Sequence, residues 1–178
     1  MGKFLNGLDD DKDNFQTPEW LCKELVDGLN LPANSTVLEP TPGAGNLAKA
    51  LEVNYKVSVP KWDFWDEEDV IHSQKFDAVV MNPPFADGES ILMKSMQLAD
   101  KVVAIIPWIT VLSSDKRTAK LKQWGIERIW HLPRKCFTGI SVPLMALFLT
   151  KGYKGDVTCR FVDYVEEIKP NRKKRPVW

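Results

Sequence analysis

The sequence is poor in the residues that build metal sites and disulfide frameworks. Its three cysteines, Cys22, Cys136 and Cys159, are far apart and form no Cys-x-x-Cys pair. There are only two histidines, His72 and His131. This composition argues against a disulfide framework and leaves a zinc site with too few ligands, so we expect no metal.

The chain also lacks long apolar runs and a net charge. No run approaches the roughly 20 residues of a membrane helix, and the start turns acidic too soon for a signal peptide. We therefore expect a cytoplasmic protein with no membrane partner. The 24 acidic and 24 basic residues cancel, but they are unevenly placed. Residues 1–14 are expected to be a flexible acidic arm. Residues 169–178 form a basic tail, in which Lys173, Lys174 and Arg175 can hold phosphates.

What the chain does contain is a regular alternation of helical and strand patterns. At 178 residues, with 44% hydrophobic residues, it has the size of one globular domain. Helices are expected at 15–29, 46–53, 90–99 and 113–125, and strands at 36–39, 55–59, 76–82, 101–107 and 126–133. Several of these strands are apolar throughout, which is typical of a parallel sheet covered on both faces. Segments 142–150 and 157–165 are expected to form an antiparallel hairpin. The fold class is therefore α/β, with a mainly parallel sheet and a C-terminal antiparallel hairpin.

A glycine-bearing loop, EPTPGAG, follows the first expected strand. Gly43 and Gly45 allow the backbone to approach a ligand, and the helix that follows favours an anion at its N-terminus. The Gly-x-Gly-x-x-Ala spacing, with Asp63 about 20 residues later, also fits a dinucleotide site. A tight turn without a ligand is the plain alternative. Glu39 favours a bound polar ligand, because it places a charge at the end of an apolar strand.

The strand at 76–82 ends abruptly in Asn82-Pro83-Pro84-Phe85. Two adjacent prolines fix two φ angles and remove two backbone donors, so the strand cannot continue. The resulting corner holds Asn82 and Phe85 in set directions. Such rigidity can serve a plain turn or a functional site.

Four short motifs together resemble the amino-methyltransferases that use S-adenosylmethionine. They are FQTP at 15–18, EPTPGAG at 39–45, DF at 63–64 and NPPF at 82–85. Their order is similar to that of adenine-N6 DNA methyltransferases of the γ arrangement. The segment HLPRKCFTG, which carries Phe137, resembles the one that presents a second aromatic ring to the target base. The resemblance spans residues 15–152 and implies a Rossmann-like class I methyltransferase fold with S-adenosylmethionine as cofactor.

The resemblance also implies which residues form the site. The catalytic residues would be Asn82, Pro83, Pro84 and Phe85. The cofactor-binding residues would be Phe15, Thr17, Pro18, Glu39, Pro40, Thr41, Gly43, Gly45, Asp63, Phe64 and Asn82. The substrate-binding residues would be Phe85, Phe137, Lys173, Lys174 and Arg175.

The chemistry explains why the corner needs these residue types. The side-chain carbonyl of Asn82 and the main-chain carbonyl of Pro83 can accept the two hydrogens of the adenine amine, which aims its lone pair at the methyl group. Catalysis then consists of positioning and electrostatics. Phe85 and Phe137 can stack on the base, each contributing roughly 1–3 kcal/mol. The base must first be flipped out of a duplex. No Pro-Cys pair offers a thiolate, which disfavours methylation of cytosine at carbon 5.

Each motif also has a plain structural explanation. NPPF can be a loop, and FQTP can be a helix start in which Thr17 is the cap and Pro18 the first helical residue. Phe137 can be a core residue, and Asp63 an ordinary surface acid.

The sequence departs from the family pattern in two places. Only about 30 residues separate the glycine loop from NPPF, less than two ordinary βα units need. The one strand there ends in Val59-Pro60, not in the acid that grips the ribose. Either Asp63 does this work or a strand has been lost, which would leave a weak, partner-dependent or inactive pocket. We also expect no separate target-recognition domain. Loops 86–89 and 113–117, or a protein partner or second copy, would then supply recognition, with low sequence specificity.

The leading hypothesis is therefore an S-adenosylmethionine-dependent adenine-N6 methyltransferase acting on DNA. Adenine in RNA is the first alternative, because NPPF does not contact the sugar, and a protein glutamine amide is another. A catalytically inactive methyltransferase-fold subunit is the alternative outside enzymes. A nicotinamide oxidoreductase would explain the glycine loop but leaves NPPF and FQTP without a role.

Overall fold

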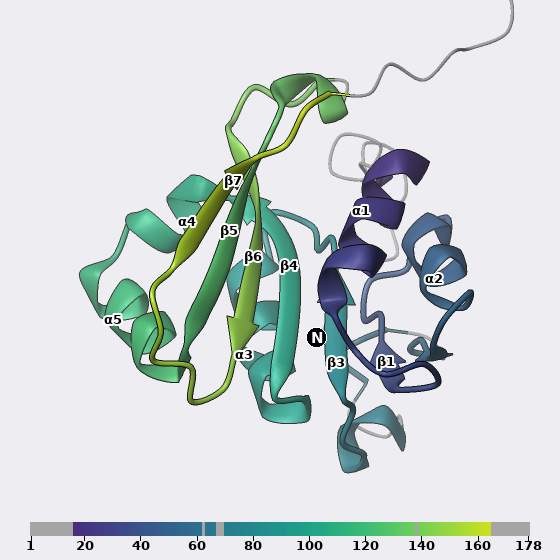
Figure 1. The fold of residues 1–178 in the computed structure, drawn as a ribbon. Helices are drawn as coiled ribbons and strands as arrows, with labels where there is room; N and C mark the ends of the chain where they lie inside the picture. The colour runs from purple at the N-terminus through teal and green to yellow at the C-terminus, as the bar shows by residue number, and fades with distance from the viewer. Residues whose placement is uncertain (1–15, 62, 67–69, 138, 165–178) are drawn as a thin grey trace, which may run out of the picture.

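The computed structural model describes residues 16–61, 63–66, 70–137 and 139–164 (Figure 1). They form a seven-stranded sheet in the order β2-β1-β3-β4-β6-β5-β7. The strands are β1 (Thr36–Leu38), β2 (Lys56–Ser58), β3 (Ala78–Met81), β4 (Lys101–Pro107), β5 (Ile126–Leu132), β6 (Leu144–Thr150) and β7 (Thr158–Phe161). The helices are α1 (Glu19–Leu29), α2 (Asn46–Leu51), α3 (Gly88–Leu98), α4 (Trp108–Leu112) and α5 (Asp115–Trp124), with short 3₁₀ turns η2 (Val70–Ser73) and η3 (Arg134–Cys136).

The pairing confirms the expected fold class. Strands β2, β1, β3 and β4 are parallel neighbours, and β7 is parallel to β5. Strand β6 lies between β4 and β5 and is antiparallel to both. The sheet is therefore mainly parallel, with an antiparallel hairpin formed by β5 and β6.

The expected partners of that hairpin were wrong. Segments 142–150 and 157–165 contain β6 and β7, and these two strands do not pair with each other. Six of the seven residues of β6 are buried, so this strand needs neighbours on both sides, whereas all four residues of β7 are exposed. Burial therefore places β6 inside the sheet and leaves β7 at its edge.

Alternating side chains of the central strands fill two separate cores. Val103 and Ile105 of β4 join a cluster with Leu21 and Leu25 of α1, while neighbouring Ala104 faces the opposite cluster. Helices α1 and α2 cover the first face, and α3, α4 and α5 cover the second (Figure 1). This two-sided burial is why the strand is apolar throughout its length.

The helix boundaries show one error and one confirmed prediction. Thr17 does not cap α1, and Pro18 lies before the first helical residue. Thr17 is instead buried, 3% exposed, and its main-chain carbonyl accepts a hydrogen bond from Asn46 Nδ2 at 3.2 Å. In α5 the expected serine cap is present, because Ser114 Oγ accepts from the Arg117 main-chain N–H at 3.3 Å.

The expected compression between the glycine loop and NPPF is confirmed. Among the described residues between α2 and β3, the only strand is the three-residue β2, which forms one edge of the sheet. The expected strand at 55–59 is thus present, and the residues described between it and β3 contain no second one. Strands β1, β2 and β3 of this half have three or four residues each and are shorter than β4, β5 and β6, which have seven each.

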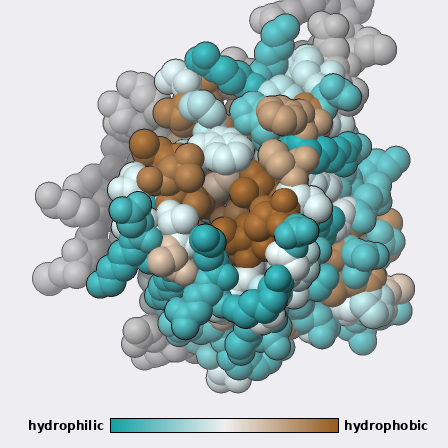
Figure 2. Space-filling view, turned by 60° about the vertical axis from the view of Figure 1, so that its left-hand side comes forward, coloured by the Kyte–Doolittle hydropathy of each residue, from teal (hydrophilic) through white to brown (hydrophobic). Residues whose placement is uncertain are grey.

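The side of the molecule that carries α4 and β7 has exposed apolar side chains. Ile109 and Leu112 of α4 are 65% and 62% exposed, and Phe161 of β7 is 76% exposed. Figure 2, in which this side is turned forward, shows apolar residues gathered in the middle of the face with hydrophilic residues around them. No helix in the described part of the chain has both the length and the hydropathy to cross a membrane.

Candidate active site

The direction in which strands are added to the sheet reverses at β1. From β1 the chain proceeds outward to β2, and then returns to β3 on the other side of β1. The register pairs Leu38 with Val79, so Glu39 and Pro40 leave β1 beside the last residues of β3. The glycine loop and the NPPF corner therefore emerge side by side at the carboxyl edge of the sheet. This reversal point is where open α/β sheets bind ligands.

Glu39 is a buried acid at this point. It is 1% exposed, and its Oε1 accepts from the Thr41 main-chain N–H at 3.0 Å and from Thr41 Oγ1 at 3.2 Å. Burial raises the pKa of Glu39 to about 7, although both hydrogen bonds from Thr41 oppose this shift. A ligand that brings a positive charge or hydrogen-bond donors would stabilise the ionised carboxylate. That Glu39 marks a polar-ligand site remains a prediction.

The loop from Pro40 to Gly45 connects β1 to α2 and depends on its glycines. Gly43 and Gly45 have φ values of 50° and 84°, in the left-handed region that favours glycine. The Gly45 main-chain N–H donates to the Pro42 carbonyl at 2.7 Å, which closes the turn. A Cβ at Gly45 would come no closer than 3.9 Å to Lys49, so backbone conformation, not space, requires this glycine.

The segment before α1 is tied to this loop. Gln16 Oε1 accepts from the Ala44 main-chain N–H at 3.0 Å, and Asn46 Nδ2 donates to the Thr17 carbonyl. The structure thus brings the FQTP motif against the glycine loop, 28 and 29 residues further along the chain. Phe15, the first residue of that motif, lies outside the described residues, as do Lys173, Lys174 and Arg175.

The DF motif lies in an irregular turn after β2. Asp63 is exposed, and its Oδ1 accepts from the Trp65 main-chain N–H at 3.1 Å. Phe64 is 3% exposed and packs in the core on the α3 side of the sheet, with ring-centroid distances of 5.5 Å to both Trp65 and His72. Asp63 and Phe64 therefore have clear local structural functions, and their contact with a cofactor remains a prediction.

The NPPF corner forms as the two prolines require. Strand β3 is buried at every position and ends at Met81. Asn82 is half-buried, Pro83 is buried, and Phe85 is half-buried against the core on the α1 side. The Asp87 main-chain N–H donates to the Pro84 carbonyl at 3.2 Å, and α3 begins at the next residue.

Phe137 belongs to the same core cluster against which Phe85 packs. It is 4% exposed, so in this structure its ring is covered by the protein, and a clamp on a base remains a prediction. Neighbouring Cys136 is also buried, and burial raises the pKa of its thiol to about 11. At neutral pH this cysteine is therefore a protonated thiol, which is a poor nucleophile.

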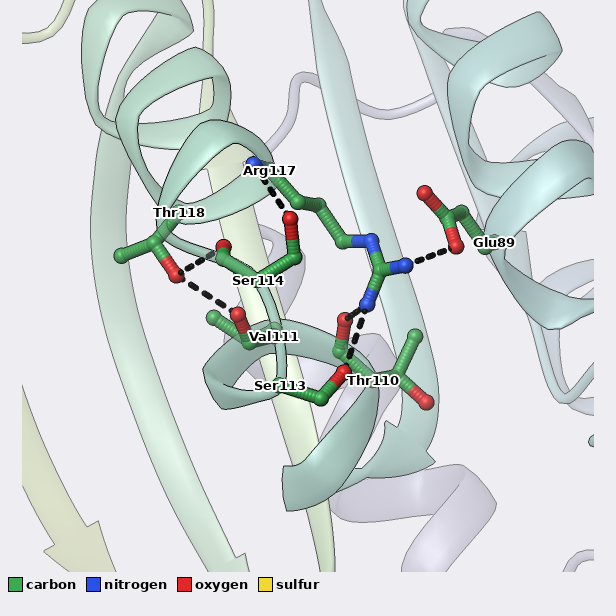
Figure 3. A network of polar contacts seen from close by, with 7 residues as sticks. All are labelled: Glu89, Thr110, Val111, Ser113, Ser114, Arg117 and Thr118. Atoms are coloured by element: carbon green, nitrogen blue, oxygen red, sulfur yellow. Dashed lines mark hydrogen bonds and ion pairs between the residues drawn. The ribbon is translucent and has the colours of Figure 1, made fainter.

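The structure reveals a polar network that the sequence did not predict as a unit (Figure 3). The Arg117 guanidinium forms an ion pair with Glu89, and it donates to the Thr110 carbonyl and to Ser113 Oγ, the latter at 3.0 Å. Loops 86–89 and 113–117 were separate candidates in the sequence. Helix α4, which was not expected, is the element that connects β4 to this network. Its five residues are too few to show a helical period.

Comparisons by sequence found no match among protein-family models or curated proteins. Comparisons of structure found many similar folds. A type I restriction-modification system methyltransferase subunit from Streptococcus thermophilus has a TM-score of 0.59 and 16% identity, with 83% of this chain and 47% of that chain covered. The 23S rRNA methyltransferase ErmE has a TM-score of 0.60 and 14% identity, over 77% and 69%. A dimethyladenosine transferase from Plasmodium falciparum has a TM-score of 0.59 and 15% identity, over 76% and 62%.

These likenesses show the fold. The described chain has the fold of class I S-adenosylmethionine-dependent methyltransferases. It spans about half the length of the restriction-modification subunits that it resembles. At 13–18% identity the likeness leaves the reaction and its substrate to be argued from the site.

Proposed function

We propose that this protein transfers the methyl group of S-adenosylmethionine to the N6 amine of adenine in DNA. The observation that carries the proposal is the meeting of two motifs at the reversal point of the sheet. The acid-bearing glycine loop and the NPPF corner leave neighbouring strands there, β1 and β3. A nicotinamide oxidoreductase would need the loop but not the corner.

The residues present fit this cofactor. Glu39 offers a buried carboxylate to an ammonium group or to hydroxyls. Gly43 and Gly45 have left-handed backbone conformations, which shape the loop. When bound, S-adenosylmethionine supplies an electrophilic methyl group. The remaining proposed cofactor contacts are Phe15, Thr17, Pro18, Pro40, Thr41, Asp63, Phe64 and Asn82.

The chain's own residues would act by orientation. The side-chain carbonyl of Asn82 and the main-chain carbonyl of Pro83 accept the two amine hydrogens, and this directs the nitrogen lone pair away from the ring plane. Pro84 holds the corner stiff, and Phe85 stacks on the base. No general base is needed before the bond forms, because the proton becomes acidic only as the nitrogen gains positive charge. That proton would then pass to water, and S-adenosylhomocysteine would be the leaving group.

Adenine in RNA is the second candidate substrate. NPPF contacts the base and not the sugar, and two of the similar structures are described as an rRNA methyltransferase and a dimethyladenosine transferase. An inactive subunit is the third possibility, and it is favoured by the shortness of β1 and β2, which have three residues each. In any of these cases target recognition would come from loops 86–89 and 113–117, or from a protein partner or second copy.

One experiment separates these candidates. The full chain is incubated with methyl-deuterated S-adenosylmethionine and with unmethylated DNA, RNA or protein, and each pool is digested and analysed by mass spectrometry. Label in N6-methyldeoxyadenosine supports the proposal. Label in RNA adenosine or in glutamine would mean that the substrate is RNA or protein instead of DNA. Absence of label from a folded, cofactor-binding protein would refute catalysis by the chain alone.

A further inference from the structure

A basic groove lies between α3 and α5, beside the NPPF corner. It is a cavity of about 210 Å³ lined by Glu89, Met93, Ser114, Lys116, Arg117 and Lys120. We call these six residues the α3–α5 groove. Three of them are cations and one is an anion, so the lining carries a net charge of +2 at neutral pH.

The ion pair at the groove leaves two lysines to face solvent. Arg117 and Glu89 neutralise each other, with side-chain exposures of 17% and 46%. Lys116 and Lys120 are exposed and four residues apart, so they lie on the same face of α5. Neither forms an ion pair with another described residue. Their charge is therefore available to an external anion.

The wall that carries these lysines is held in place. Arg117 bonds α5 to Glu89 of α3 and to Thr110 of α4 (Figure 3). Thr118 Oγ1 donates to the Val111 carbonyl at 2.6 Å, which is a second bond from α5 to α4. An anion that binds here would meet a groove already formed, so little ordering entropy would be lost.

The groove is adjacent to the proposed catalytic corner. Gly88 directly precedes Glu89, and a Cβ at Gly88 would lie 3.7 Å from Pro83 Cγ and 3.9 Å from Ile106 Cγ2. The first turn of α3 is thus packed on the corner itself. A nucleic-acid strand that delivers a base to Asn82 would pass along this edge.

We infer that the α3–α5 groove binds a backbone phosphate of the nucleic-acid strand that carries the target base. This inference rests on the proposed function and extends it to the substrate contact. The phosphate is favoured over an acidic protein because the groove is small and adjoins the corner. Lysine contacts of this kind position the strand without reading its sequence.

The test compares Lys116→Ala/Lys120→Ala with the control Lys122→Ala, which removes one positive charge instead of two, in the full chain. Lys122 is exposed on the same helix but is not part of the groove. Binding of a labelled unmethylated duplex is measured by fluorescence anisotropy between about 50 and 200 mM salt. We expect the double variant to bind about tenfold more weakly. The magnitude of its log–log salt slope should fall by about 0.9, since the one phosphate held by the groove is no longer neutralised. The control should change neither quantity.

Three results would overturn the inference: no binding by the unaltered protein, equal weakening in the control, or an unchanged salt slope in the double variant. Labelled polyglutamate is measured in parallel. If the double variant no longer binds polyglutamate but keeps DNA binding, an acidic protein is the occupant and the inference is wrong. Because the binding assay contains no cofactor, DNA binding that depends on the groove without methyl transfer would refute catalysis by the chain alone and leave the groove's role in binding standing.

Discussion

The two halves of the sheet differ in the length of their strands. The half that carries the glycine loop consists of β1 and β2, with three residues each, and β3, with four. The other half contains β4, β5 and β6, with seven residues each. Both halves are buried by helices, since α1 and α2 cover one face of the sheet and α3, α4 and α5 cover the other. The short strands lie on the side of the sheet that is proposed to bind the cofactor.

The largest expected effect tests whether stability resides in the long strands. Leu147 of β6 is fully buried, and replacing it with alanine should lower the free energy of unfolding by about 2–5 kcal/mol. Val57 of the edge strand β2 is only partly buried, so Val57→Ala should cost less than about 1.5 kcal/mol. Urea unfolding of both variants measures the difference. Equal destabilisation would mean that the halves do not differ in this way.

The next effect is on catalysis at the corner. Asn82→Ala should lower kcat for adenine methylation roughly 100- to 1,000-fold, because one preorganised acceptor is removed. Gln97→Ala, an exposed position on α3, is the control and should retain full activity. Rates are measured with saturating cofactor, and circular dichroism verifies folding. Unchanged methyl transfer by Asn82→Ala would exclude the role assigned to this residue.

Glu39 makes the cofactor half sensitive to pH. Its folded pKa, about 7, is above the ordinary value of 4.5, so the native state binds more protons than the unfolded state between these values. Stability should therefore be highest below about pH 4.5 for this group and fall as the pH rises towards about 7, by up to about 3 kcal/mol in all.

Glu39→Gln should remove this slope. Urea unfolding of both proteins without cofactor, at about pH 5 and pH 8, measures the difference between them. In the unaltered protein a bound cationic ligand should also flatten the slope, because it stabilises the carboxylate. A slope that persists in Glu39→Gln would have to come from another group.

The smallest effect concerns the hydrogen bond that ties the FQTP motif to the glycine loop. Gln16→Ala removes the hydrogen bond to the Ala44 main-chain N–H and should weaken cofactor binding about fivefold, or about 1 kcal/mol. Ser35→Ala is the control, because in the described part of the chain Ser35 Oγ bonds within its own exposed turn, at 2.8 Å to the Pro32 carbonyl. Calorimetry with S-adenosylmethionine gives both affinities. Equal affinities would show that this hydrogen bond does not shape the site.

Much of this architecture could be predicted from local patterns. The corner at Pro83 and Pro84, the glycines of the loop and the Ser114 cap all follow from backbone restrictions that act within a few residues. The compression before β3 also followed from chain length. The prediction that Thr17 caps α1 was wrong. Thr17 is buried instead, and its main-chain carbonyl accepts a hydrogen bond from Asn46, 29 residues away.

By itself, then, the sequence determined which segments form strands, where the chain must turn, and which chemistry the motifs Glu39–Gly45 and Asn82–Phe85 can support. Tertiary structure alone decided that β6 lies between β4 and β5, that Phe137 is covered by the core, and that Arg117 meets Glu89. The physical reason is range: φ restrictions and hydrophobic periods are local, whereas strand neighbours, burial and ion pairs depend on residues that meet only after the whole sheet has formed.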